Sequence, residues 1–209
     1  MYLIFDFDGT LVDSFSCVVE KFNSMANDFN VSKISREDMA ELRHLSSTDL
    51  IKYLKVPLYK IPYALHLARK HLKQEMHKLT PFAGIPQLLH NLDEAGFQLG
   101  IVTSNSKENV ISWLESHQIK HYFNFIHVEL GYFGKGRILK KVRQVHKTGN
   151  SMYIGDETRD IVAAKQCNMA SLAVTWGFNS EKILAQYNPH YIARRPEDIL
   201  AIGLKHLEI

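Results

Sequence analysis

Residues 4–14 of the chain read IFDFDGTLVDS, an apolar run that ends in two carboxylates, Asp6 and Asp8, on either side of one aromatic residue. A short run rich in β-branched and aromatic residues is typical of a buried strand, and the Asp-Gly pair that follows is typical of a turn. Taken alone, such a turn is more often structural than catalytic. Two acids at the end of a buried strand would repel each other, however, which favours a chemical role for this strand end.

Apolar runs of the same kind recur along the chain and predict a sheet. The candidate strands are YLIF (2–5), FQLGIVT (97–103), FNFIHV (123–128), SMYIG (151–155), SLAVTW (171–176) and HYIA (190–193). Apolar residues at helical spacing lie between them in residues 85–92, 110–114 and 138–145, and two more helices are expected over 157–168 and from Pro196 onward. Strands that alternate with helices predict an α/β fold with a doubly wound, mostly parallel sheet.

Residues 15–80 interrupt this alternation, because they contain no good strand candidate. Helices are expected over 16–28, 36–43 and 47–54, and one long amphipathic helix is expected through Leu65, Ala68, Leu72, Met76 and Leu79. The economical interpretation is a small all-α cap, residues 15–80, inserted after the first strand. Residues 1–14 and 81–209 would then form the core, with hinges near residues 12–15 and 80–84.

The composition is that of an ordinary globular protein. The 209 residues are 45% hydrophobic, and 25 Lys and Arg against 22 Asp and Glu give a net charge of +3. This charge is too small to predict nucleic-acid binding, and no apolar stretch approaches the roughly 20 residues that span a membrane. Cys17 and Cys167 match neither a metal-ligand spacing nor a disulfide framework. We therefore expect a reduced, cytoplasmic setting without secretion or membrane association.

Polar residues follow directly after several of the apolar runs. Ligands of open α/β sheets bind beyond the carboxyl ends of the strands. The residues at those positions are Asp6 and Asp8, Thr103-Ser104-Asn105, Lys135 at the start of a helix, and Asp156 with Asp160. Acids gathered from two strand ends would repel strongly unless a cation neutralised them, which predicts a hard divalent ion, Mg²⁺. One carboxylate can then attack phosphorus while a second protonates the leaving oxygen.

With these residues in place, the chain resembles the haloacid dehalogenase-like superfamily, in its phosphoglycolate-phosphatase-like and β-phosphoglucomutase-like subgroup with a helical cap. The resemblance covers essentially the whole chain and is carried, in the family's order, by FDFDGTLVDS, LGIVTSN, the GK of YFGKGR, and YIGDETRDIVAA. It implies a Rossmann-like core. It also implies hydrolysis or phosphoryl transfer, because Asp8 stands where dehalogenases lack an aspartate and ion-pumping ATPases carry threonine.

Carried over residue by residue, the resemblance makes Asp6 the nucleophile that becomes an aspartyl phosphate. Asp8 would protonate the leaving group, later activate water, and lend its backbone carbonyl to Mg²⁺. Thr103 would bind the transferring phosphoryl group, and Lys135 would steady its charge and that of Asp6. Asp6 and Asp156 would also be metal ligands.

The resemblance assigns supporting roles to further residues. Asp160 would support the metal or orient its waters, and the backbone amides from Phe7 through Gly9 to Thr10 would cradle phosphate oxygens, with Gly9 allowing a close approach. Ser104 and Asn105 are also candidate phosphate or substrate contacts. Each of Thr103, Ser104 and Asn105 is equally suited to cap the helix that begins near Lys107.

Specificity is expected from the cap. In relatives a cap loop closes over the leaving group, and ELRHLSS (41–47) falls where that loop would be. Arg43 is therefore a candidate substrate contact, able to bind a carboxylate or a second phosphate, although a solvated arginine is equally expected. His44 and Ser46 are weaker candidates. His44 replaces the glycine of many β-phosphoglucomutase-like relatives, which argues against a sugar-phosphate mutase.

The sequence thus predicts a Mg²⁺-dependent phosphatase for a small phosphorylated metabolite. The alternatives are a phosphomutase, a nucleotide phosphatase or pyrophosphatase, and a binding protein that keeps the fold without catalysis. The basic stretches 69–78 and 135–147 raise the question of nucleic acid, but solvated helix faces explain them more simply. The sequence does not distinguish a monomer from a homodimer.

Overall fold

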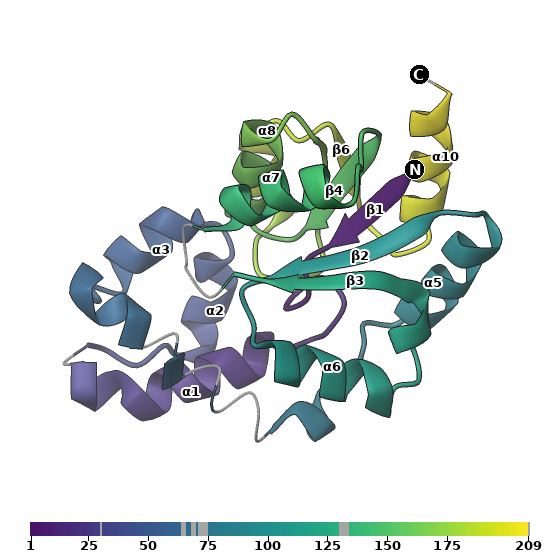
Figure 1. The fold of residues 1–209 in the computed structure, drawn as a ribbon. Helices are drawn as coiled ribbons and strands as arrows, with labels where there is room; N and C mark the ends of the chain where they lie inside the picture. The colour runs from purple at the N-terminus through teal and green to yellow at the C-terminus, as the bar shows by residue number, and fades with distance from the viewer. Residues whose placement is uncertain (30, 64–65, 68–69, 71–74, 130–133, 209) are drawn as a thin grey trace.

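The computed structural model describes residues 1–29, 31–63, 66–67, 70, 75–129 and 134–208. In this part of the chain six strands form one parallel sheet in the order β3-β2-β1-β4-β5-β6 (Figure 1). They are β1 (Tyr2–Phe5), β2 (Gln98–Thr103), β3 (Phe123–Val128), β4 (Ser151–Gly155), β5 (Ala170–Val174) and β6 (Tyr191–Ala193). The strand order runs outward in both directions from β1, so the predicted doubly wound parallel sheet is confirmed.

Helices cover both faces of the sheet, as Figure 1 shows. On one face lie α7 (Lys135–Val145) and α8 (Thr158–Gln166), and on the other lie α5 (Ile85–Glu94), α6 (Lys107–Ser116) and α10 (Asp198–Leu207). Side chains of a strand point alternately to the two faces. In β1, Leu3 and Phe5 pack in the apolar cluster that contains Leu88 of α5, whereas Ile4 packs in the cluster that contains Leu139 of α7. Burial on both faces explains why the strand reads as a continuous apolar run.

Some element bounds differ from those expected. The helix expected from Pro196 begins at Asp198, because the Asp198 carboxylate accepts hydrogen bonds from the backbone amides of Arg194 and Arg195 and holds the preceding residues in a turn. The helix α9 (Glu181–Gln186) was not expected, since its six residues are too few to show helical periodicity and bury only Leu184. None of the helices that the structure describes is long and apolar enough to cross a membrane.

Residues 15–80 are helical where the structure describes them. The helices α1 (Phe15–Phe29), α2 (Arg36–Leu42) and α3 (Ser47–Tyr53) lie beyond the carboxyl ends of β2 and β3 (Figure 1). The described residues also contain short 3₁₀ helices at η1 (Leu58–Lys60), η2 (Met76–Lys78) and η3 (Lys120–Tyr122). Of the expected long helix, Leu65, Ala68 and Leu72 lie outside the described residues, and its end is η2, with Met76 and Leu79 buried.

The two connections between this helical segment and the sheet run side by side. The amide of Asp13 donates to the carbonyl of Thr80 at 3.1 Å, and the amide of Phe82 donates to the carbonyl of Leu11 at 3.1 Å. Val12 also forms an antiparallel bridge with Pro81. The segment between them therefore leaves and rejoins the rest of the chain at one place. The division into a core of 1–14 with 81–209 and a cap of 15–80 stays a prediction.

Candidate active site

The turn after β1 fixes the direction of the first two acids. Phe7 is fully buried between them and meets Trp113 edge to face, with ring centroids 5.2 Å apart. The amide of Gly9 donates to the carbonyl of Val12 at 2.9 Å, and Gly9 itself has φ +75°. A left-handed conformation of this kind favours glycine. Because Phe7 anchors the turn in the core, Asp6 and Asp8 are carried by a fixed backbone.

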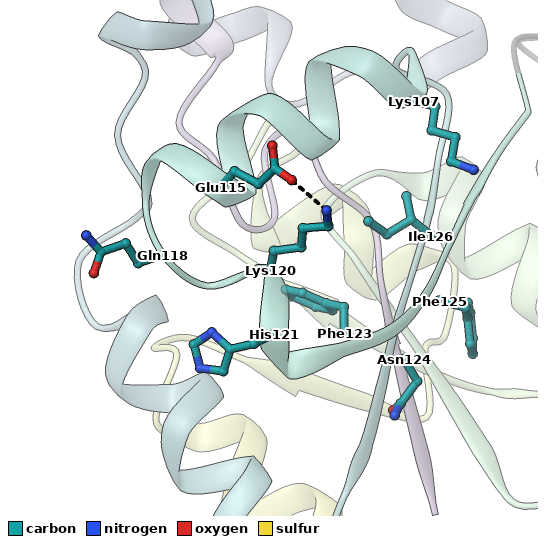
Figure 2. A pocket seen from close by; sticks show the side chains of 9 residues that line it. All are labelled: Lys107, Glu115, Gln118, Lys120, His121, Phe123, Asn124, Phe125 and Ile126. Carbon is teal, nitrogen blue, oxygen red and sulfur yellow. Dashed lines mark hydrogen bonds and ion pairs between the residues drawn. The ribbon is translucent and has the colours of Figure 1, made fainter.

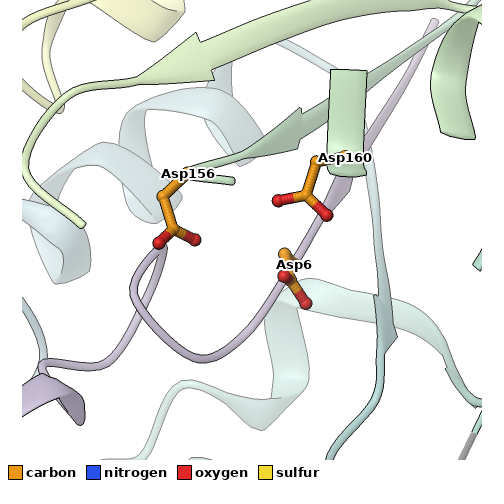
Figure 3. Close-up of side chains that lie close together, drawn as sticks. All are labelled: Asp6, Asp156 and Asp160. Carbon is orange, nitrogen blue, oxygen red and sulfur yellow. The ribbon is translucent and has the colours of Figure 1, made fainter. Parts of the chain in front are cut away.

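Asp6, Asp156 and Asp160 come together although they lie far apart in the sequence. Asp6 follows β1 and Asp156 follows β4, and these two strands are neighbours. Asp160 belongs to the first turn of α8. Their carboxylates converge in Figure 3, and one oxygen of each lies within 4.8 Å of the others. All three residues are at most 2% exposed. The structure therefore brings together three of the four predicted metal ligands as side chains, at the predicted edge of the sheet.

Lys135 is the cation nearest to these acids. As the first residue of α7, it donates through Nζ to Asp6 Oδ2 at 2.6 Å and to Asp160 Oδ1 at 2.5 Å. Burial disfavours the charged ammonium, but Asp160 and Asp6 outweigh this effect and raise the pKa of Lys135. The lysine is thus a fixed positive charge between two carboxylates, as its predicted role requires.

One lysine does not neutralise the cluster. Burial raises the pKa of Asp156 well above its usual range, and the nearby Glu157, Asp160 and Asp6 add to this effect. Burial likewise raises the pKa of Asp160 to about 6, with Lys135 acting against it. Carboxylates in this condition gain stability from a further cation. Oxygen ligands of this kind suit a hard divalent ion, so the donor set fits Mg²⁺.

Asp156 is held in place through both of its carboxylate oxygens. Thr10 donates its hydroxyl to Oδ1 at 2.8 Å, and the backbone amide of Phe178 donates to Oδ2 at 2.7 Å. A side chain on Gly9 or Gly177 would collide with the Asp156 carboxylate. These two glycines allow the backbones of two loops to pass close to Asp156, so its carboxylate packs against both loops.

Asp8 has different surroundings from Asp6. Its Oδ2 accepts a hydrogen bond from Asn105 Nδ2 at 2.9 Å. Burial raises the pKa of the Asp8 carboxyl, while Ser14, Asn105 and the more distant Arg159 and Lys135 act in the opposite direction. No lysine or arginine ion pair with Asp8 occurs in the part of the chain that the structure describes. Asp8 is therefore a half-buried acid with a neutral hydrogen-bond partner.

The predicted phosphate-binding residues lie around these acids. Thr103, the last residue of β2, is 1% exposed, and its Oγ1 accepts a hydrogen bond from the amide of Asn105 at 3.0 Å. The Thr103 hydroxyl proton is therefore left to donate elsewhere. Among the amides from Phe7 to Thr10, that of Gly9 donates to Val12 and that of Thr10 donates to Phe7. Ser104 is half-buried beside Thr103.

The cap residues contact a core loop rather than an open space. Arg43 Nη2 donates to the backbone carbonyls of Gly177 at 2.7 Å and Thr175 at 3.3 Å. His44 Nδ1 lies 2.7 Å from the hydroxyl of Ser180, and the Asn179 side chain donates to the carbonyl of Leu45 at 3.0 Å. Ser46 caps α3. Whether Arg43 also contacts a substrate stays a prediction.

One surface pocket lies away from these acids. It has a volume of about 630 Å³ and lies beside the edge strand β3, with Lys107, Phe123 and Ile126 among its lining side chains (Figure 2). The aspartates of the cluster are not among them. The candidate site is therefore identified by its chemistry and by the strand ends.

Some residues that build the site were not predicted from the sequence. The segment 175–180 supports Asp156 and receives Arg43 mainly through backbone groups, which have no side-chain signature. Asn109, in α6, is 1% exposed and donates to Asn105 Oδ1 at 2.9 Å. Its place in the first turn of the helix predicted after Asn105 was the available signal.

Known proteins that are similar to this chain include phosphatases. A family model described as haloacid dehalogenase-like hydrolase matches residues 3–174. A protein of Synechococcus elongatus named phosphoglycolate phosphatase is 34% identical over 95% of this chain and 94% of its own length. A protein of Halalkalibacterium halodurans named pyrophosphatase PpaX is 26% identical over 97% of each chain. The crystal structure of a predicted phosphatase from Clostridium acetobutylicum has a TM-score of 0.83, with 24% identity over 98% of each chain. This chain therefore belongs to the haloacid dehalogenase-like hydrolase family.

Proposed function

We propose that this protein is a Mg²⁺-dependent phosphatase that hydrolyses a small phosphomonoester through an aspartyl phosphate on Asp6. The observation that carries the proposal is the contrast between two acids of one turn. Asp6 is paired with the ammonium of Lys135 at 2.6 Å, whereas burial raises the pKa of Asp8. A carboxylate beside an ammonium suits a nucleophile, and an acid whose pKa is raised suits a proton donor.

In the first step an Asp6 carboxylate oxygen attacks phosphorus and the bond from phosphorus to the leaving oxygen breaks. Asp8 gives its proton to that oxygen and becomes a carboxylate. The hydroxyl of Thr103 and the ammonium of Lys135 bind the phosphoryl oxygens as charge builds on them. The amides of Phe7 and Asp8 suit the same task, since those of Gly9 and Thr10 already donate within the turn.

In the second step a water attacks the phosphorus of the aspartyl phosphate. Asp8, now a carboxylate, takes a proton from that water, and the bond between phosphorus and Asp6 breaks. Inorganic phosphate leaves, and both acids return to their starting states. One residue thus serves as acid and then as base, which requires that Asp8 stay next to the reacting oxygen in both steps.

Asp6, Asp156 and Asp160 would hold the metal ion. Support comes from their shared space, their burial and the excess of negative charge that Lys135 leaves. When bound, Mg²⁺ would offset the charge of the carboxylates and of the phosphoryl oxygens. Residues 15–80 would form a cap over the site, which is supported by the side-by-side connections at residues 11–13 and 80–82 and by the contacts of Arg43 with the core.

A screen of phosphate release from phosphorylated metabolites tests the proposal. Phosphoglycolate and pyrophosphate are tested first, because two relatives are named phosphoglycolate phosphatase and pyrophosphatase PpaX. Sugar phosphates and nucleotides follow. We expect release from at least one small phosphomonoester in Mg²⁺ and none in EDTA. Interconversion of sugar phosphates with little phosphate release would instead establish a mutase.

The control is Asp6→Asn, which preserves the size of the side chain and removes the nucleophile. We expect no phosphate release from this variant, with a circular dichroism spectrum like that of the wild type. Turnover by Asp6→Asn would refute the proposed mechanism. Equal release in Mg²⁺ and in EDTA would refute the metal requirement.

A further inference from the structure

Tyr153 is a buried aromatic residue next to the candidate site. It lies in β4 and is 1% exposed. Its ring belongs to the apolar cluster between the sheet and α7, which also contains Ile4 of β1. Side chains alternate along a strand, so Asp6 follows Ile4 on the same face of the sheet. Tyr153 is therefore on the face where Lys135 meets Asp6.

The ring of Tyr153 contacts the ammonium of Lys135. Nζ of Lys135 lies over this ring, 5.6 Å from its centroid. The face of an aromatic ring carries partial negative charge and attracts a cation within about 6 Å, more strongly where water is excluded. Lys135 is only 4% exposed. Its ammonium has three N–H donors, of which two serve Asp6 and Asp160, so the ring supports the charge while the third donor stays available to a phosphoryl oxygen.

The hydroxyl of Tyr153 holds the ring in place from the opposite end. It donates to the backbone carbonyl of Val102 at 2.8 Å. Val102 belongs to β2, so this side chain reaches from β4 across β1 to a third strand. The register of β1 with β2 ends at the pair of Phe5 and Ile101, and Val102 lies one residue beyond it. Thr103 is the next residue. The hydroxyl therefore ties the ring to the backbone beside Thr103.

We propose that Tyr153 is a positioning residue that holds the ammonium of Lys135 through the face of its ring, with its hydroxyl fixing the ring beside the end of β2. This inference rests on the proposed phosphatase mechanism, in which Lys135 and Thr103 bind the same phosphoryl group. Tyr153 contacts Lys135 directly and the backbone next to Thr103. Its side chain therefore helps to set the distance between the two groups that bind the phosphoryl oxygens.

A cycle of two substitutions measures the contact without catalysis. Lys135→Met removes the charge and keeps an apolar stem, whereas Tyr153→Leu removes the ring. Urea unfolding in EDTA compares wild type, both single variants and the double variant. We expect Tyr153→Leu to raise the equilibrium constant of unfolding by roughly 5-fold to 30-fold more in the wild-type background than in the Lys135→Met background, the range of a cation–π contact. Equal changes in the two backgrounds would overturn the inference.

The matched control is Phe125→Leu. Phe125 is an aromatic residue of the same apolar cluster, and its ring lies against His127 and His146. The effect of Phe125→Leu on the unfolding constant should be the same with and without Lys135→Met. Additivity in this control, next to non-additivity at Tyr153, separates attraction of the cation from loss of apolar packing.

Ring-fluorinated phenylalanines provide a second test if Tyr153→Leu does not fold. Tyr153→Phe keeps the ring, and fluorine atoms on that phenylalanine withdraw negative charge from the ring face with little change in size. Stability in EDTA should fall stepwise as fluorine atoms are added, and this trend should vanish in the Lys135→Met background. Stability that does not depend on fluorination would contradict the contact with the ammonium.

Rates of phosphate release connect the contact to the proposed function. For the substrate found in the screen, Tyr153→Leu should lower kcat roughly 5-fold to 30-fold, whereas Tyr153→Phe should retain most of the rate because it keeps the ring. In the Lys135→Met background, Tyr153→Leu should cause no further fall. Equal losses in Tyr153→Phe and Tyr153→Leu would rule out the role of the ring. A wild type that releases no phosphate, while the unfolding cycle shows the coupling, would refute the proposed function alone.

Discussion

Asp6 and Asp8 leave the same turn two residues apart, yet the protein surrounds them in opposite ways. Asp6 meets the ammonium of Lys135 at 2.6 Å, and that ammonium also meets Asp160 at 2.5 Å. Asp8 meets the neutral amide of Asn105 at 2.9 Å. In a buried place a cation favours the charged carboxylate, whereas a neutral donor offsets only part of the lost hydration. The different surroundings of the two acids therefore come from the partner that the fold places beside each one, and not from their positions in the turn.

The largest expected effect comes from removing the acid with the neutral partner. Asp8→Asn should lower turnover of an alkyl phosphate by about 10²-fold to 10⁴-fold, because the leaving oxygen then has no proton donor and the attacking water has no proton acceptor. Initial rates of phosphate release measure this loss. With para-nitrophenyl phosphate the variant should still phosphorylate Asp6, which mass spectrometry of acid-quenched protein would detect. Full turnover of the alkyl ester would remove the proposed distinction between the two acids.

The next effect tests the cationic partner of Asp6. Lys135→Met leaves Asp6 and Asp160 buried without their shared ammonium. Removal of one partner from a buried ion pair costs about 3–5 kcal/mol, so the variant should lose stability of this order in EDTA. Urea unfolding measures the loss, and Mg²⁺ should restore part of it if the cation binds the same carboxylates. Lys140→Met, at an exposed position of the same helix, is the control. A variant as stable as wild type in EDTA would contradict the pairing.

The sequence was most informative where side chains at strand ends carry the chemistry. The strand runs 2–5, 123–128 and 151–155 coincide with β1, β3 and β4. The carboxyl ends of parallel strands lie at one edge of a sheet, so the predicted parallel sheet alone led to the expectation that Asp6 and Asp156 meet there. In the structure β1 and β4 are neighbours. Their approach depends only on topology, which alternating strands and helices already indicate.

The rest depends on tertiary contacts that leave little trace in a sequence. Asn105 looked like a phosphate ligand or a helix cap, and its contact with Asp8 arises from the approach of two loops separated by almost one hundred residues. Phe178 acts on Asp156 through a backbone amide, which any residue could provide. Arg43 was a candidate substrate contact or a solvated side chain, and its hydrogen bonds to backbone carbonyls of the segment 175–177 had no signal in the sequence.

A smaller effect concerns stability and its dependence on pH. The pKa of Asp8 in the folded protein is raised above its ordinary value of 3.8, so the native state binds this proton more tightly than the unfolded chain. The contribution of Asp8 to stability is therefore full at low pH and is lost as pH rises through the folded pKa. Asp8→Asn carries no such charge and should be more stable than wild type at about pH 7, with a gain that shrinks toward about pH 4. Thermal unfolding in EDTA at several pH values measures this, and an equal gain at every pH would contradict it.

The smallest expected effect lies at the proposed cap, on the Asp156 side of the site. Arg43 donates to the carbonyls of Thr175 and Gly177, and the same loop donates to Asp156 through the amide of Phe178. In Arg43→Lys the side chain is shorter and ends in an ammonium instead of a planar guanidinium. It therefore cannot reproduce both hydrogen bonds to the carbonyls of Thr175 and Gly177. A lost hydrogen bond of about 1 kcal/mol between the proposed cap and the core should weaken substrate binding, which raises KM about 5-fold and changes kcat less. Steady-state kinetics on the substrate found in the screen measure the split, with the exposed Arg137→Lys as the matched control. A fall in kcat with unchanged KM would instead assign Arg43 to the reaction itself, and would extend the contrast between Asp6 and Asp8 to a third charged group.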